Sequence, residues 1–191
     1  MASRFAMLAG LAALVASPLP GHAAAGRHRV KAAIPPGVDV DGDGAADFIN
    51  PTGLGLRGVD GFGSGAFLAS RDEGARLHRG ADFVAAAGQR VNAPMSGYVT
   101  KIGYPYGDDL SLRYVELTNR AIGYVVRIFY VQPGVTLGQA LRQGDMIGVS
   151  QSLQRRYPAI TDHVHVELTD LAYGHVDPAK FIPTPGPSGP D

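Results

Sequence analysis

The 191-residue chain contains no cysteine and no tryptophan. Without cysteine it has no disulfides, cysteine-ligated metals, iron–sulfur clusters or thiol nucleophile, so any metal site must use His, Asp or Glu. Its 17 basic and 17 acidic residues balance, and no run of Lys and Arg is longer than two. Because nucleic-acid-binding proteins usually carry a clustered basic excess, this balance argues against nucleic acid as the main partner.

Glycine and proline are abundant, with 26 and 14 residues, and the sequence shows no long amphipathic helix pattern. Both residue types punctuate turns, which favours a mainly β fold with many short strands and few short helices. We expect strands over residues 98–102, 112–117, 124–131, 146–149 and 163–168, with a hairpin turn at 118–123.

Residues 1–25 are typical of a secretory signal peptide. Arg4 precedes an apolar run over residues 5–15, proline and glycine at 18–21 break the run, and alanines at 23–25 offer a cleavage site. A buried core helix is the alternative, which these chain-breaking residues disfavour. The run is shorter than the roughly 20 residues that span a bilayer. We therefore expect an exported protein, periplasmic or secreted, with no membrane span after cleavage.

An acidic segment follows a basic, proline-broken linker. Its carboxylates occupy the first, third, fifth and ninth positions of a calcium-loop pattern: Asp39, Asp41, Asp43 and Asp47. Gly44 stands at the sixth position, where the loop turns sharply, but Asn50 replaces the usual glutamate at the twelfth. The pattern predicts a calcium site, and a solvated Asp/Gly turn without metal is the alternative.

The segment His163-Val164-His165-Val166-Glu167 alternates strictly. On a strand, His163, His165 and Glu167 would share one face and the valines the other. The two histidines could be metal ligands, or an exposed pair with no ligand role.

A second motif supports the metal hypothesis. His78 and Asp82 are four residues apart, with Gly80 between them to let the backbone bend. Two histidines and one carboxylate leave an open metal position, as in catalytic zinc sites, where the metal lowers the pKa of a bound water toward about 7. Non-haem iron(II) oxygenases and cupin-like barrels are alternatives, although the former usually begin with His-x-Asp and the latter need further ligands.

Four motifs in order resemble the lysostaphin/LytM-type zinc peptidases. They are His78-x-Gly80-x-Asp82, the Val91–Val99 segment, Gly144-Asp-Met-Ile-Gly148 and His163-Val-His165-Val-Glu167. The likeness covers about residues 75–182. Residues 127–133 and 157–165 are more similar still to the vertebrate leukocyte cell-derived chemotaxin branch of that family.

The resemblance implies a small antiparallel β-sheet or sandwich with a zinc site in a groove. It implies Zn²⁺ on His78, Asp82 and His165, with His163 as the catalytic residue that polarises water or stabilises the oxyanion. The usual substrates are peptide bonds in peptidoglycan. The chain would then comprise a signal peptide (1–25), a linker and calcium-loop-like region (26–74), a peptidase-like domain (75–182) and a disordered tail (183–191).

One segment departs from the family pattern. Active members carry a further histidine in a Tyr-x-His-Leu segment, where this chain reads Tyr130-Val131-Gln132-Pro133. We expect Gln132 at the histidine position, and glutamine cannot exchange a proton near neutral pH. The chemotaxin branch keeps zinc, lacks this histidine and acts in binding. A non-catalytic zinc module that binds cell-wall peptide or a protein partner is therefore the alternative to an enzyme, unless Tyr130, Tyr104 or His175 supplies the missing group.

Overall fold

The computed structural model describes residues 38–185. The predicted signal peptide (1–25), most of the predicted linker and residues 186–191 of the predicted tail lie outside the described residues. Within 38–185 the fold is mainly β and its named strand pairs are antiparallel, which confirms the predicted fold class. Its two helical segments, η1 (Asp72–Gly74) and η2 (Pro178–Lys180), are single 3₁₀ turns, far shorter than a membrane-spanning helix.

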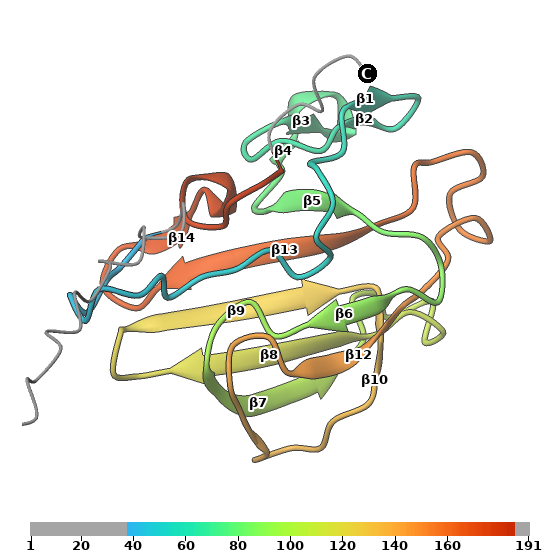
Figure 1. The fold of residues 1–191 in the computed structure, drawn as a ribbon. Helices are drawn as coiled ribbons and strands as arrows, with labels where there is room; N and C mark the ends of the chain where they lie inside the picture. The colour runs from blue at the N-terminus through green and yellow to red at the C-terminus, as the bar shows by residue number, and fades with distance from the viewer. Residues whose placement is uncertain (1–37, 186–191) are drawn as a thin grey trace, which may run out of the picture. The chain divides into compact units, whose positions relative to one another are not determined.

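A seven-stranded antiparallel sheet forms the main layer (Figure 1). Its strand order is β11-β7-β8-β9-β13-β14, and β5 pairs with β13 on the side away from β9. The bounds are β5 Ala81–Val84, β7 Gly97–Gly103, β8 Tyr114–Asn119, β9 Tyr124–Phe129, β11 Ala140–Leu141, β13 His163–Asp170 and β14 Gly174–Val176. β7, β8, β9 and β13 confirm four of the five predicted strands.

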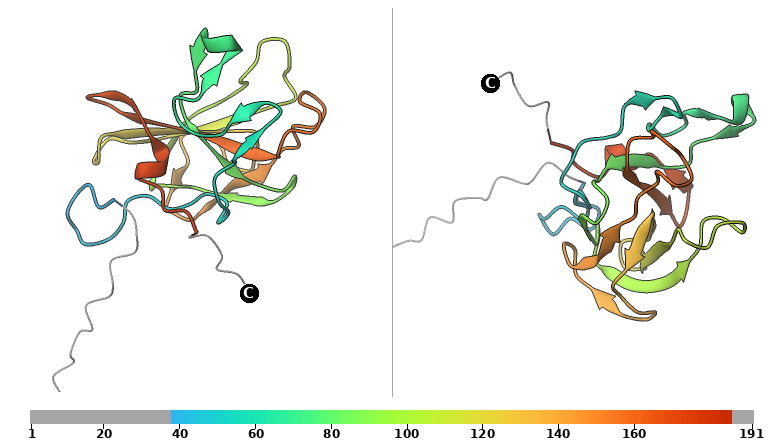
Figure 2. Two further views of the ribbon diagram at one scale, coloured as in Figure 1. Left: turned by 90° about the horizontal axis from the view of Figure 1, so that it is seen from above. Right: turned by 90° about the vertical axis from the view of Figure 1, so that its right-hand side faces the viewer.

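A three-stranded sheet, in the order β10-β12-β6, packs on the main layer, and two short hairpins lie beyond β5 (Figures 1 and 2). The bounds are β6 Arg90–Asn92, β10 Val131–Pro133 and β12 Met146–Ser150, with β1 Val59–Asp60, β2 Gly63–Ser64, β3 Ser70–Arg71 and β4 Arg76–Leu77 in the hairpins. β12 is the fifth predicted strand.

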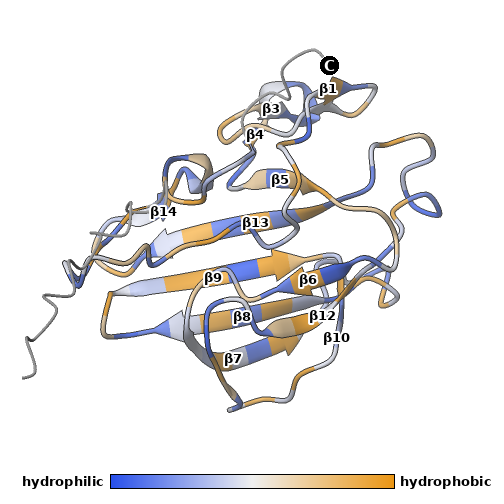
Figure 3. Ribbon diagram, in the orientation of Figure 1, coloured by the Kyte–Doolittle hydropathy of each residue, from blue (hydrophilic) through white to orange (hydrophobic). Residues whose placement is uncertain are grey.

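Side-chain alternation places the core between the two sheets. Along β13, Val164, Val166 and Leu168 are fully buried, and β9 alternates in the same way. Figure 3 shows the resulting change of hydropathy along both strands. The faces of β13 are therefore fixed by burial of the valines, which directs His165 and Glu167 to the opposite face.

The segment before β1 belongs to the same core. Phe48 is fully buried and packs edge-on against Tyr124 and Phe181, at ring-centroid distances of 5.3 and 5.6 Å. Further along, Leu56 bridges to Phe83 of β5. Residues from the predicted N-terminal region thus help to build the domain, and they fix the chain that leads into the hairpins.

Candidate metal centre and its cavity

Three metal-ligating side chains converge from distant segments. His78 follows β4, Asp82 lies in β5 and His165 lies in β13. The pairing of β5 with β13 places Asp82 directly opposite His165. Gly80 lies so close to the Val166 carbonyl that any Cβ there would clash with it. The fold therefore brings the expected ligands together, with His78 and Asp82 buried.

The donor atoms of this cluster fit a metal ion. His78 Nε2 lies 2.8 Å from His165 Nδ1 and 3.2 Å from Asp82 Oδ1, and His165 Nδ1 lies 2.9 Å from the same oxygen. In tetrahedral zinc, with bonds of about 2.1 Å, neighbouring ligand atoms are about 3.4 Å apart. Shifts of a few tenths of an ångström would give that spacing.

The outer ring nitrogens explain why a cation is needed. His78 Nδ1 lies 2.7 Å from the Ala66 carbonyl oxygen, and His165 Nε2 lies 3.6 Å from a Glu167 carboxylate oxygen. Hydrogens directed to these acceptors leave the inner nitrogens with lone pairs. The two lone pairs would repel each other and the carboxylate, so either a metal ion lies between them or, without one, the inner nitrogens are protonated and donate to Asp82.

Arg57 neutralises the other oxygen of the Asp82 carboxylate. Its Nε and Nη2 each lie 3.0 Å from Asp82 Oδ2, and its Nη1 lies 2.7 Å from Asp60 Oδ1. Burial alone would raise the pKa of Asp82, but hydrogen bonds from His165 and His78 outweigh it and hold the pKa well below its usual range. Asp82 is therefore ionised, with Oδ1 directed to the histidines and Oδ2 to Arg57.

His163 lies beside the cluster and has a different environment. Its Nδ1 donates to the Thr161 carbonyl at 2.6 Å, and its Nε2 lies 3.6 Å from Asp82 Oδ2. Burial lowers the pKa of His163, and the attraction of Asp82 only partly opposes this shift. The ring is thus neutral near pH 7, with the Nε2 lone pair available as a proton acceptor.

The structure places Tyr130, and not Gln132, in the cavity. Tyr130 lines the cavity, and its ring centroid lies 5.6 Å from that of His163. Gln132 lies on β10, where it is exposed and pairs with Val149. Gln132, which the resemblance places at the site, is thus not among the residues that line the cavity, and its role stays a prediction. The chain crosses from β9 to β10 at Tyr130, whose φ of 65° turns its side chain out of the strand alternation.

Tyr130 belongs to a hydrogen-bonded row of aromatic side chains. The Tyr106 and Tyr130 hydroxyls are 2.7 Å apart, and Tyr157 donates to the Tyr106 hydroxyl at 3.0 Å. Arg156 Nε in turn donates to the Tyr157 hydroxyl at 3.2 Å, and its guanidinium lies 4.0 Å from the Tyr106 ring centroid. Because Tyr106 accepts from Tyr157, its own hydrogen is free for Tyr130, which leaves the Tyr130 hydrogen for the cavity.

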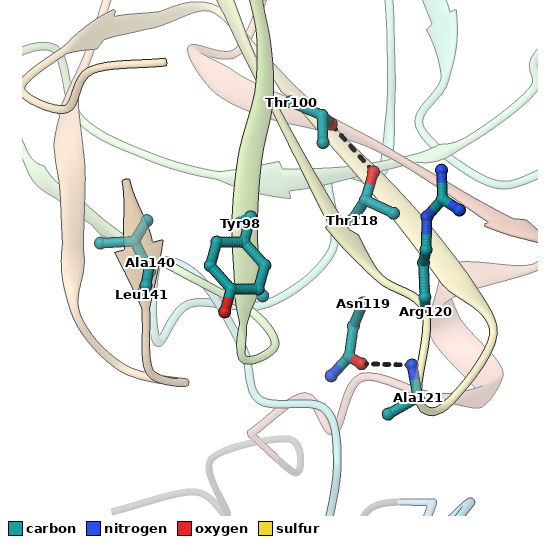
Figure 4. Close-up of a pocket in the computed structure, with 9 residues that line it drawn as sticks. Tyr98, Thr100, Thr118, Asn119, Arg120, Ala121, Ala140 and Leu141 are labelled. Atoms are coloured by element: carbon teal, nitrogen blue, oxygen red, sulfur yellow. Dashed lines mark hydrogen bonds between the residues drawn. The ribbon is translucent and has the colours of Figure 1, made fainter. Parts of the chain in front are cut away.

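These groups line one cavity of about 650 Å³. Arg57, Arg71, Arg76 and Asp72 line it with the ligand cluster, together with the aromatic residues Phe62, Tyr106, Tyr130 and Tyr157. A second pocket, of about 420 Å³, lies over β7, β8 and β11 around Tyr98 and Asn119 (Figure 4). His and acidic side chains are absent from that lining, so we assign the metal chemistry to the first cavity.

Other sequence candidates lie elsewhere. His175 is exposed on β14 and lines a different pocket, with Phe67. Tyr104 is 47% exposed, with the Arg113 guanidinium over its ring. Neither lines the cavity of the ligand cluster.

The acidic loop is compact but exposed. Ligand oxygens of Asp39, Asp41 and Asp43 lie within 4.8 Å of one another, while Asp47 stands outside this group and accepts from Val40 N at 2.7 Å. Asp39 accepts from the backbone of Gly42 and Gly44. The carboxylates thus satisfy the loop's own N–H groups, and calcium on Asp39, Asp41, Asp43 and Asp47 stays a prediction that a titration at millimolar Ca²⁺ would test.

Sequence reasoning missed the arginine that contacts Asp82. A signal was present, since Arg57 and Asp60 are the only charged residues between positions 51 and 70. An isolated opposite-charge pair in a glycine-rich, otherwise apolar stretch indicates a buried ion pair. Tyr106 and Tyr157 gave no comparable signal, because their contacts join loops far apart in the sequence.

Comparison with known proteins agrees with this geometry. The model of Peptidase family M23 matches residues 76–178. Leukocyte cell-derived chemotaxin-2 from Mus musculus is 31% identical over 128 residues, which cover 66% of this chain and 79% of that protein. The Bos taurus protein of the same name is 29% identical over the same shares.

The solved structure of the antimicrobial peptidase lysostaphin from Staphylococcus simulans has a similar fold, with a TM-score of 0.51 at 18% identity. The match covers 70% of this chain and 52% of that one, so this chain spans about half of that structure.

Proposed function

Because this chain belongs to peptidase family M23, we propose that it is an exported zinc metalloendopeptidase that hydrolyses peptide bonds of peptidoglycan. The observation that carries the proposal is that His163 lines one cavity together with the His78, Asp82 and His165 cluster. Export rests on the signal-peptide pattern of residues 1–25, and the substrate class rests on the family resemblance.

Different residues of the chain bind the metal ion and accept the proton. His78, Asp82 and His165 hold the zinc ion. When bound, zinc acts as a Lewis acid and makes water a nucleophile near neutral pH. His163 accepts a proton at Nε2, since its Nδ1 hydrogen is held by the Thr161 carbonyl.

Tyr130 supplies a hydrogen-bond donor for the charge that develops on the substrate carbonyl oxygen. Burial raises its pKa to about 12, so the phenol keeps its hydrogen at neutral pH. The row from Arg156 through Tyr157 and Tyr106 ends on Tyr130, and the Tyr130 hydrogen is left for the cavity when Tyr106 donates to its oxygen. Successive donors polarise one another, which strengthens the last hydrogen bond in the row.

The alternative function is a non-catalytic zinc-containing module that binds cell-wall peptide or a protein partner. One observation favours it. The pKa of the Tyr130 phenol is raised to about 12, so Tyr130 does not release a proton near pH 7. Among the described residues, His163 is then the only imidazole base beside the cluster. Similarity to proteins named chemotaxin-2 points the same way.

Hydrolysis of purified cell wall by the exported protein separates the two functions. We expect cleavage that stops with chelator and returns with added zinc. His163→Ala should lose about 10²–10⁴ in rate while it keeps stoichiometric zinc, and His165→Ala should lose the metal. His175→Ala is the matched control, because His175 is exposed outside the cavity. A protein that binds zinc but shows no chelator-sensitive cleavage would be the binding module.

A further inference from the structure

The cavity contains an arginine that the chemistry described so far does not use. Arg71 ends β3, and its side chain is 15% exposed and lines the cavity. Its Nη2 donates to the Ser64 carbonyl at 2.6 Å and its Nη1 to the Ser70 carbonyl at 3.1 Å. Neutral carbonyls therefore fix the guanidinium in position without neutralising its charge.

The carboxylates around the cavity are engaged by other groups. Asp72 pairs with Arg76 at 3.0 Å, and Asp60 pairs with Arg57 at 2.7 Å. In the part of the chain that the structure describes, the carboxylate that pairs with Arg71 is Asp82, whose Oδ2 lies 4.0 Å away. That oxygen already accepts two hydrogen-bond contacts from Arg57 at 3.0 Å. Arg71 is thus a partly buried cation without a carboxylate of its own.

Charge around the cavity shows which ligand would suit it. Three arginines (57, 71 and 76) face three aspartates (60, 72 and 82), so their formal charges cancel. A divalent ion on the ligand cluster adds two positive charges. A ligand that brings a carboxylate next to Arg71 offsets part of this excess and forms the charge-assisted, two-pronged contact that arginine favours.

Aromatic side chains also line the cavity. Phe62 is 40% exposed and packs edge-on against Tyr157 with ring centroids 5.6 Å apart. Tyr106 continues this aromatic surface. The cavity lining therefore combines arginine side chains with aromatic ones around the ligand cluster. A peptide that carries a carboxylate and an aliphatic side chain matches both kinds of group.

We propose that Arg71 binds a carboxylate of the peptide ligand beside the His78, Asp82 and His165 cluster, so that the cavity selects peptides bearing a carboxylate next to the bond held there. This proposal rests on the proposed function only in taking the ligand to be a peptide. It does not require that the peptide is cleaved. It holds equally for an enzyme and for a binding module.

The test measures binding to the full-length, zinc-loaded protein by calorimetry. The probes are acetyl-Ala-Ala, which carries a free carboxylate, and its carboxamide, each in L and D configurations. We expect the wild type to bind the carboxylate of one configuration at least tenfold more tightly than the matching amide. Arg71→Met should remove this preference while it leaves amide affinity within about twofold, and Arg71→Lys should retain part of the preference.

One control variant and the outcomes that overturn the proposal complete the test. A carboxylate can also coordinate zinc directly, and in that case Arg71→Met would keep the full preference, which overturns the proposal. Equal affinities for carboxylate and amide in the wild type, or binding of neither, overturn it as well. Arg76→Met, whose exposed pair with Asp72 also lies at the cavity, should change the preference by less than about threefold. If Arg71→Met fails to fold, Arg71→Lys and the wild-type probe comparison decide.

The proposed function can be refuted independently of the role of Arg71. Absence of chelator-sensitive cell-wall cleavage, together with a retained carboxylate preference, would remove the peptidase and leave Arg71 as a ligand-binding residue of the module.

Discussion

Replacing Arg57 by methionine removes a buried guanidinium from two carboxylates. The Arg57 side chain is only 3% exposed, and its nitrogens lie 2.7 Å from Asp60 and 3.0 Å from Asp82. Methionine fills much of the same volume but cannot donate. Both carboxylates then keep their negative charge in a poorly solvated place without the guanidinium, which destabilises the folded state.

The magnitude follows from this burial. Removing one partner of a buried ion pair costs about 3–5 kcal/mol, whereas an exposed pair contributes less than about 1 kcal/mol. We expect the lower part of the first range for Arg57→Met, because His78 and His165 still hydrogen-bond Asp82. Arg76→Met is the matched control, since the Arg76 and Asp72 side chains are 59% and 63% exposed.

Urea unfolding in excess chelator measures both variants. We expect Arg57→Met to lose about 3 kcal/mol with an unchanged m value, and Arg76→Met to lose less than about 1 kcal/mol. Zinc should stabilise Arg57→Met more than the wild type at the same free concentration, because the ion becomes the main cationic partner of Asp82.

Equal losses for the two variants would refute the reasoning that Arg57 neutralises a buried ligand. If Arg57→Met does not fold without metal, Arg57→Lys replaces it. Lysine keeps the positive charge but lacks the paired N–H donors of the guanidinium, so we expect an intermediate loss of stability.

Three further predictions concern single positions. Between pH 10 and 12 the wild type should lose about 2–3 kcal/mol more stability than Tyr130→Phe. Burial raises the pKa of Tyr130 to about 12, whereas the phenol of the unfolded chain ionises near 10, so rising pH favours the unfolded state. Parallel curves of stability against pH for the two proteins would contradict this. Gly80→Ala should destabilise by more than about 2 kcal/mol in thermal unfolding, since its Cβ would clash with the Val166 carbonyl, while Gly55→Ala, with open space, stays near neutral. Gln132→His should leave hydrolysis and zinc affinity within about twofold of wild type, because Gln132 is exposed outside the cavity; a clear gain in rate would restore Gln132 to the site.

The strands and the ligand cluster were accessible from the sequence because local patterns encode them. The valines that alternate with His163 and His165 fix which face of β13 is buried, and the interval from His78 to Asp82 is short enough to read directly. The β5–β13 pairing then places Asp82 opposite His165, as a three-ligand set requires.

The remaining features depend on contacts between segments that lie far apart in the sequence. Alternation fails at Tyr130, where a positive φ accompanies the passage of the chain from one sheet to the other, and the match to the Tyr-x-His-Leu segment does not carry this turn. Arg57 is 25 residues from Asp82, and the two meet where the Leu56–Phe83 bridge and the hydrogen bond from Arg57 N to the Asp82 carbonyl join their segments. A motif search finds ligands but does not find the side chains that neutralise them.

The convergence of His78 and His165 has a mechanical consequence for a chain without cysteine. These two residues are 87 positions apart, and a metal ion bound to both would close that loop as a covalent cross-link does. A disulfide that closes a loop of this size stabilises the folded state by about 4–5 kcal/mol, because it lowers the conformational entropy of the unfolded chain. A metal link would resist reductants and yield to chelators or acid, so the persistence of the folded protein would follow the zinc content of its surroundings and not their redox potential.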